Sequence, residues 1–390
     1  MRNHIFDCIG GNEWHFSDEI FKKLTGRNIS SQYYPEIPVS IRKIPNLLSK
    51  KNLYIIHWGR PTFKDLDCNY LLHVHDNDII DFVVSTSSGN TVEGMARAIQ
   101  NYNNNRGKEI KAILLVPALS SFKVARSAIH GNDSVKLIVL ENSTLDSIRK
   151  FASDLVRKLS ENNRVVIADA DLKTAAYSQM GLLLDKSNLL SEDTCFVQTV
   201  SGGVGPTGLI EAARKLNAKP ELLLVQTTNG PSSPTIDALE AHSKGEDPIQ
   251  LLERGKYETP SFETTLGSTK PIYSVKKFIE WRDEGGLILG VRVSENELYG
   301  KREVVLQSLL EIGIYPNEDL GLRYFNLERS GFLAFVGLLK SVKNINAENI
   351  VINYTGRYVD PLVAFPEVAK PHISFDPREK INLLLEKLIW

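Results

Sequence analysis

The chain has 390 residues, of which 42% are hydrophobic and 24% charged, with a formal net charge of −1 at pH 7. This length allows two domains with a large core, and the near-neutral charge argues against a dedicated nucleic-acid binder, which would normally carry a strongly basic domain. No apolar run approaches the roughly 20 residues that span a bilayer, and the first residues lack a signal-peptide pattern. Three cysteines without metal-type spacing indicate reduced thiols. We therefore expect a cytoplasmic protein with no metal, no membrane and no nucleic-acid partner.

The first 50 residues contain several prolines and predict an extended lead-in rather than a domain. The β-rich run 52–57 then predicts a strand. From residue 79 onward, short apolar runs alternate with helix-like periodicity, which favours mostly parallel sheets covered on both faces. The remaining predicted strands are 79–84, 112–116, 137–140, 165–168, 196–199, 222–225, 287–291 and 350–354.

Helical spacing of apolar residues follows three junctions, at Asn90, at Thr144 and at Pro206. The run 142–144 is a candidate N-cap for the second of these helices. The polar stretch 242–272 has prolines, glycines and no clear period, so it predicts an irregular excursion.

Two motifs point to chemistry in the first hundred residues. Arg60-Pro61-Thr62-Phe63-Lys64-Asp65 presents a lysine just after a proline turn, and residues 85–91 form a serine-rich loop with a glycine and an asparagine between a strand and a helix. Such a junction offers free backbone N–H groups and a helix dipole to an anion. A lysine near an anion-binding loop suggests an amine that forms a Schiff base with a carbonyl compound.

A second anion-binding loop is predicted at residues 201–208, where Ser-Gly-Gly-Val-Gly-Pro-Thr-Gly follows a strand and opens a helix. Glycines allow several backbone N–H groups to turn toward one anion. A dinucleotide site is the competing functional interpretation, but Glu221 precedes the next strand instead of following it. A tight strand-to-helix turn without a ligand is the structural alternative.

Taken together, these motifs resemble the fold-type II pyridoxal-phosphate (PLP) enzymes of the tryptophan synthase β superfamily, most of all threonine synthase and cysteate synthase. The resemblance implies an α/β fold with two open, mostly parallel twisted sheets flanked by helices. It also implies that a small substrate-closing domain, residues 80–190, is inserted into a large cofactor-binding domain formed by residues 1–79 and 191–390.

The resemblance assigns roles to individual residues. Lys64 would hold the cofactor PLP as a Schiff base and, once released, act as the base at the substrate Cα–H; Thr355 would lie near the pyridine nitrogen. Capping of a helix by Ser88 or Asn90 is the plain alternative for the serine-rich loop. The implied cofactor-binding residues are Lys64, Asn90, Ser201, Gly202, Gly203, Val204, Gly205 and Thr355, and the implied residues for the substrate carboxylate are Thr86, Ser87, Ser88, Gly89, Asn90 and Thr91.

The implied activity is elimination or replacement at the β or γ carbon of an amino acid, and a phosphorylated amino acid is one option. Arg60, Lys123 and Arg126 are candidate phosphate contacts, with solvated surface charge as the alternative. Leu66 and Val204 depart from the family pattern and leave the substrate open. A serine/threonine dehydratase, a cysteine-synthase-like enzyme and a non-catalytic PLP-binding homologue are the alternatives. Intact Lys64 argues against the last of these. Oligomeric state stays open, with a homodimer as one option.

Overall fold

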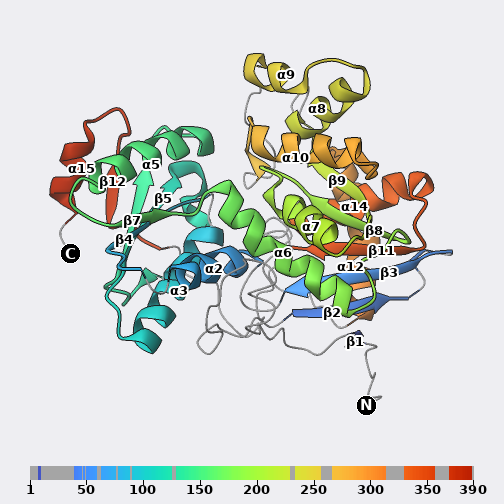
Figure 1. The fold of residues 1–390 in the computed structure, drawn as a ribbon, viewed down its shortest axis with the longest axis horizontal. Coiled ribbons are helices and arrows are strands. Elements are labelled where there is room, and N and C mark those ends of the chain that lie inside the picture. The colour runs from blue at the N-terminus through green and yellow to red at the C-terminus, as the bar shows by residue number, and fades with distance from the viewer. Residues whose placement is uncertain are drawn as a thin grey trace. The chain divides into compact units, whose positions relative to one another are not determined.

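The computed structural model describes residues 8–9, 39–45, 47–48, 50–58, 63–75, 78–87, 90–124, 129–228, 233–255, 266–312, 329–355 and 369–388. Contacts within the chain divide it into two compact units. One unit takes in residues 36–63 and 177–361 together with strand β1, and the other takes in residues 64–176 and 362–390. Each unit is built around one sheet with helices beside it (Figure 1).

The larger sheet has the strand order β1-β2-β3-β11-β8-β9-β10. Strands β3, β11, β8, β9 and β10 run parallel, and β2 and β1 are added antiparallel at one side. Of the parallel strands, β3, β8, β9 and β11 are almost entirely buried, as expected where helices cover both faces of a sheet, whereas the edge strand β10 is only partly buried. The bounds are β1 Cys8–Ile9, β2 Val39–Ile44, β3 Asn52–Trp58, β8 Thr194–Thr199, β9 Glu221–Thr227, β10 Ile288–Val293 and β11 Asn349–Tyr354.

Helix α14 lies against the larger sheet and approaches it closely, because a Cβ at Gly337 would overlap a methyl carbon of Val225. Helices α6 and α7 approach each other in the same way, since a Cβ at Gly181 would overlap the Cβ of Ala212. The helices along this part of the chain are α6 Ala170–Lys186, α7 Val204–Lys215, α8 Pro234–Ser243, α9 Pro248–Arg254, α10 Ile272–Asp283, α11 Glu295–Gly300, α12 Arg302–Glu311 and α14 Arg329–Ser341, and η5 spans Val342–Asn344.

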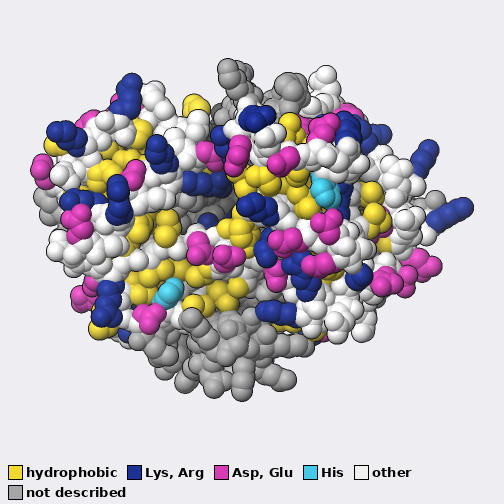
Figure 2. All heavy atoms as spheres, turned by 45° about the horizontal axis from the view of Figure 1, so that its top comes forward, with side chains coloured by type: hydrophobic (Ala, Val, Ile, Leu, Met, Phe, Trp, Pro, Cys, Tyr) yellow, Lys and Arg dark blue, Asp and Glu magenta, His cyan; other side chains and the backbone are white. Residues whose placement is uncertain are grey.

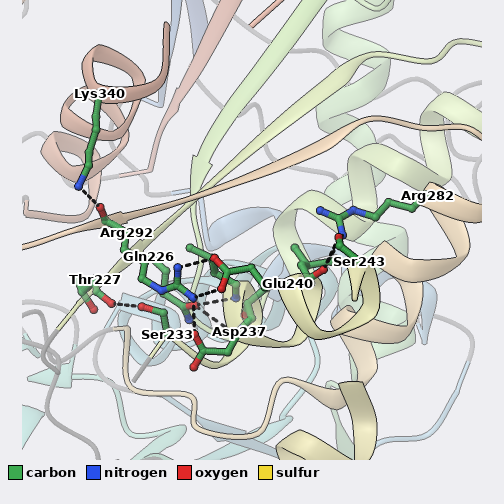
Figure 3. A network of polar contacts seen from close by, with 12 residues as sticks. Gln226, Thr227, Ser233, Asp237, Glu240, Ser243, Arg282, Arg292 and Lys340 are labelled. Atoms are coloured by element: carbon green, nitrogen blue, oxygen red, sulfur yellow. Dashed lines mark hydrogen bonds and ion pairs between the residues drawn. The ribbon is translucent and has the colours of Figure 1, made fainter. Parts of the chain in front are cut away.

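A polar network fastens α8 and α14 to the edge strand β10 (Figure 3). The guanidinium of Arg292 donates to Asp237 at 2.5 Å and to Glu240 at 2.6 Å. From the other side, the Lys340 ammonium donates to the backbone carbonyl of Arg292 at 3.0 Å. Exposed pairs of this kind contribute little to stability, so the network orients two helices on a sheet whose apolar face supplies most of the free energy.

The smaller sheet is parallel throughout, with the order β12-β6-β5-β4-β7. The side chain of Thr144 accepts the N–H of Ser147 at 3.3 Å and caps α5, while the Ser147 hydroxyl accepts the N–H of Thr144 at 2.8 Å. This reciprocal cap confirms the N-cap predicted from the sequence. The bounds are α2 Asp65–Val74, β4 Phe82–Thr86, α3 Asn90–Arg106, β5 Lys111–Pro117, η2 Ala118–Lys123, β6 Val135–Leu140, α5 Leu145–Leu159, β7 Val165–Ile167, β12 Ile373–Phe375 and α15 Ile381–Lys387.

Every predicted strand is present, and the predicted fold class of two mostly parallel sheets flanked by helices is confirmed. Corrections concern segments with weak local signals. Val39–Ile44, within the predicted lead-in, is strand β2. Pro248–Arg254, within the predicted irregular stretch, is helix α9. Ile79, the first residue of the predicted strand 79–84, is exposed and precedes β4. The predicted domain limits at 80 and 190 stay a prediction; the compact units themselves divide the chain at residues 63/64 and 176/177, and strand β12 pairs with β6.

Basic and acidic side chains are interspersed over the face shown in Figure 2, as a net charge of −1 leads one to expect. Among the described residues, no helix combines the length and the apolar character needed to cross a bilayer.

Candidate active site

Three parallel strands of the larger sheet end side by side, and two of them, β8 and β11, lead into predicted site residues. β11 lies between β3 and β8, and Tyr354 near the end of β11 is in register with His57 near the end of β3. Thr355 and the loop beginning at Ser201 follow directly from β11 and from the end of β8. The carboxyl ends of parallel strands are the usual place for a ligand in open α/β sheets. The structure therefore brings the 201–205 loop and Thr355 to one edge.

The glycine loop is held in shape by the segment that precedes and opens α10. The Ser201 hydroxyl accepts the backbone N–H of Ser268 at 3.1 Å, and the Ser274 hydroxyl donates to the carbonyl of Gly202 at 2.5 Å. Gly203 has a φ of +73° and precedes the first residue of α7 without a side-chain cap. The first N–H groups of a helix have no partner inside it, so this pinned loop presents backbone donors and a helix dipole to an anion.

A buried polar network connects the ends of the same three strands. Trp58 donates through Nε1 to the Oδ1 of Asn353 at 2.6 Å, and the Asn353 amide donates to the Oε1 of Gln198 at 3.1 Å. A Cβ at Gly205 would lie 2.5 Å from the Nε2 of Gln198, so this network lies directly against the start of α7. No local sequence signal predicts these three side chains, because a tryptophan, an asparagine and a glutamine inside apolar strands become linked only when the strands pair.

Phe63, the residue directly before Lys64, is anchored in the apolar core of the larger unit. Its ring is 2% exposed, stacks on Tyr177 with centroids 4.4 Å apart and planes at 12°, and packs at 5.4 Å against Trp58. Burial of a whole aromatic side chain contributes about 1.5–3 kcal/mol. The chain is therefore fixed in the core of the larger unit at the residue directly before Lys64.

Lys64 is the N-cap residue of α2 and is partly buried. Burial lowers the pKa of its ammonium group below the usual value of 10.5; the negative charge of Asp67 opposes this effect, and the positive charge of Lys173 reinforces it. A lysine whose pKa is lowered supplies more neutral amine near pH 7, the form that attacks a carbonyl or removes a proton. The sequence could not show this, because it depends on the surroundings of the side chain.

The first turn of α3 lies against the first turns of α2 in the smaller unit. The thiol of Cys68 contacts the carbonyl of Thr91 at 3.5 Å, and a Cβ at Gly94 would lie 2.6 Å from the Oδ1 of Asp65. The structure thus places the start of α3, including Thr91 from the predicted carboxylate loop, beside the first turns of α2 in this unit.

Within this loop the N–H of Thr91 donates to the hydroxyl of Ser87 at 3.3 Å. The helix-capping contact that the structure describes comes from Ser87, and capping by Ser88 or Asn90, the two residues considered from sequence, stays a prediction. Ser88, Gly89 and the side chain of Asn90 lie outside the described residues. The proposed contacts of this loop with a substrate and of Asn90 with a cofactor stay predictions.

The predicted phosphate contacts Arg60 and Arg126 lie outside the described residues, as does the side chain of Lys123. Within the described ranges, no group of three or more His, Cys, Asp or Glu side chains is arranged to hold a metal ion.

No family profile matches the chain, and no curated protein matches its sequence. Solved structures do match its fold. The processed form of threonine deaminase isoform 2 from Solanum lycopersicum has a TM-score of 0.59 and 18% identity, covering 91% of this chain and 93% of that one. Threonine synthase from Escherichia coli also has a TM-score of 0.59, with 12% identity and coverage of 87% and 77%. A PLP-dependent aspartate racemase has a TM-score of 0.56 and 16% identity, with coverage of 84% and 91%.

These likenesses identify the fold: the chain has the architecture of the fold-type II PLP enzymes, and the resemblance proposed from the motifs is confirmed at this level.

Proposed function

We propose that the protein is a PLP-dependent enzyme of amino-acid metabolism. The observation that carries this proposal is Lys64, an amine with a lowered pKa that directly follows a buried anchor, Phe63, in a chain with this fold. The structural neighbours named above include an enzyme whose description states PLP dependence, which supports the choice of cofactor.

The residues present fit a phosphorylated aldehyde. The 201–205 loop, pinned by Ser268 and Ser274, offers backbone donors to the phosphate, and no acidic side chain stands within the loop to repel it. Lys64 offers the amine for the aldehyde, and Thr355 offers a neutral hydroxyl at the same sheet edge as the loop. When bound, PLP acts as an electron sink for the pair left on the substrate α-carbon.

Lys64, the loop 86–91 and Thr355 then have separate roles in the reaction. Lys64 as a neutral amine takes the substrate α-proton and becomes an ammonium ion. The serine- and threonine-rich loop 86–91 holds the substrate carboxylate at the start of α3. A hydroxyl at Thr355, in place of a carboxylate, need not protonate the pyridine nitrogen, which favours elimination and replacement over transamination. We propose this reaction class, at the β or γ carbon, with a small amino acid as the substrate.

Cofactor attachment tests the proposal directly. Borohydride reduction of the protein mixed with PLP should fix the cofactor to the peptide that contains Lys64, as mass spectrometry can show. Lys64→Ala should abolish fixation. Lys173→Ala is the matched control, because this lysine acts electrostatically on Lys64 without being the proposed attachment point, and it should retain fixation. PLP fixed to the Lys64→Ala protein at the wild-type level would contradict the proposal.

The reaction subtype can be separated by products. A dehydratase acting on L-serine or L-threonine should release ammonia and a 2-oxo acid, whereas an enzyme like threonine synthase or cysteate synthase should release inorganic phosphate from phosphohomoserine or phosphoserine. Phosphate release without 2-oxo acid would favour the synthase-like alternative that the sequence motifs suggest. Release of 2-oxo acid alone would favour the dehydratase.

A further inference from the structure

The carboxyl group of Asp67 is buried one helical turn after Lys64 and is not used in the proposed reaction. Lys64 is the N-cap of α2 and Asp67 is its third residue, so the two side chains leave the same end of the helix. Asp67 is only 1% exposed, and among the described residues its Oδ1 atom has no hydrogen-bond donor. A buried carboxylate is costly unless a charge or donors compensate it.

The neighbouring carboxylate shows the contrast. Asp65 is buried to a similar degree, but its Oδ1 accepts from the guanidinium of Arg97 at 3.2 Å. Asp65 therefore already has a cationic partner on α3, whereas Asp67 keeps an oxygen available close to the lysine.

Four ionisable groups act on the Lys64 amine besides burial itself. Asp67 and Cys68 on α2 favour its charged form, while Lys173 on α6 and Arg149 on α5 disfavour it. The pKa of the Cys68 thiol is raised well above its usual value, mainly by burial, so at neutral pH this thiol is uncharged. On α2 this leaves Asp67 as the group whose charge favours the protonated form of Lys64.

We propose that Asp67 is a positioning residue for Lys64: its carboxylate receives the ammonium form of the lysine whenever the side chain is not bonded to the cofactor. The proton balance is simple. The neutral Lys64 Nζ uses its lone pair to take the substrate α-proton, the electron pair of the broken C–H bond stays with the substrate, and the resulting ammonium is held by Asp67 until the proton is passed on.

This inference rests on the proposed function, because it gives Asp67 a role through Lys64. Two opposed influences follow from it. Burial lowers the pKa of Lys64 and so maintains neutral amine that can accept a proton. The charge of Asp67 opposes this effect and prevents the pKa from falling so far that the ammonium form cannot keep its proton. The ideal catalytic base has its pKa near the working pH, so removing Asp67 should leave the amine too weak a base.

The test measures the Lys64 amine in cofactor-free, full-length protein. Trace labelling with acetic anhydride across a pH series, followed by mass spectrometry of the Lys64 peptide, reports the fraction of neutral amine at each pH. Asp67→Asn should move the labelling midpoint of Lys64 down by about one to three pH units, the range for an opposite charge within about 4–6 Å. Asp67→Glu keeps the charge, so its labelling midpoint should lie close to that of the wild type. Asp65→Asn, on the same turn but already paired with Arg97, is the matched control and should move the midpoint far less.

An unchanged midpoint in folded Asp67→Asn protein would overturn the proposal. Should that variant not fold, Asp67→Ser takes its place in the same labelling series: the midpoint of Lys64 should again lie below that of the wild type, and an unchanged midpoint would overturn the proposal. Labelling needs no cofactor. It therefore tests Asp67 alone, whereas PLP fixed to Lys64→Ala protein would contradict the proposed function.

Discussion

Asp65 and Asp67 lie on the same turn of α2, but their surroundings give them different properties. Asp65 shares Arg97 with Glu93, the two carboxylates lying 3.2 and 3.5 Å from the guanidinium. Burial nevertheless raises the pKa of Asp65 to about 6, because the attraction of one shared arginine does not offset the loss of solvent. A single residue therefore makes stability depend on pH up to about pH 6.

We predict the sign of this dependence at Asp65. Its pKa in the folded protein, about 6, is above the ordinary 3.8, so between these values the folded chain binds a proton that the unfolded chain has lost. The stabilising contribution is full below pH 4 and is lost as the pH rises to about 6. At about 1.36 kcal/mol per pKa unit, the loss is about 3 kcal/mol. Urea unfolding of wild type and Asp65→Asn should show a difference that changes by this order between pH 4 and 7, and parallel pH profiles would contradict the prediction.

At the scale of elements, the start of α7 shows that a glycine in a binding loop can be required by the protein itself. Gly203 has a φ of +73°, and a Cβ there would lie 2.8 Å from the Cβ of Ser274 and 3.1 Å from the ring of Phe278. From the sequence, the loop glycines are explained by backbone N–H groups that turn toward one anion. The structure adds a second reason, because α10 packs against the loop from the protein side.

A comparison of Gly203→Ala with Gly245→Ala separates the cost of packing against α10 from the cost of the left-handed backbone. Gly245 also has a positive φ, +77°, but no described atom lies within 4 Å of the position that a Cβ would take there. Both substitutions incur the left-handed backbone penalty of about 1–2 kcal/mol, and only Gly203→Ala adds overpacking, worth about 1–3 kcal/mol. We expect Gly203→Ala to lower the free energy of unfolding by about 1–3 kcal/mol more than the control. If denaturant titrations gave the same loss of unfolding free energy for both variants, α10 would accommodate the added Cβ without cost.

At the scale of the whole molecule, two units with separate cores are assembled from segments far apart in the sequence. Strand β12, near the end of the chain, completes the smaller sheet by pairing with β6. Phe375 on β12 is 1% exposed and packs at 5.9 Å against Phe151 of α5. The apolar core of the larger unit draws on other residues, among them Phe335 of α14 and Val225 of β9.

Phe375→Ala should therefore weaken one unit before the other. Truncation of a buried phenylalanine costs about 3–5 kcal/mol, and hydrogen exchange should become faster in β4, β5 and β6 while β8, β9 and β11 keep their wild-type protection. Phe375→Leu preserves most of the volume and should cost less than about 1.5 kcal/mol. Faster exchange spread evenly over both sheets would mean that the units unfold as one.

Local patterns in the sequence were sufficient for strands β3 to β11, the cap at Thr144 and the strand-to-helix turn at Ser201, because periodicity, caps and glycine-rich turns act over a few neighbouring residues. Only the tertiary structure decided that β12 joins the smaller sheet, that Trp58, Asn353 and Gln198 form one network, and that Asp67 lies buried beside Lys64. These features depend on strand pairing and on exclusion of water across large sequence separations. Burial is also what lowers the pKa of Lys64, and burial is a property of the folded chain rather than of any motif.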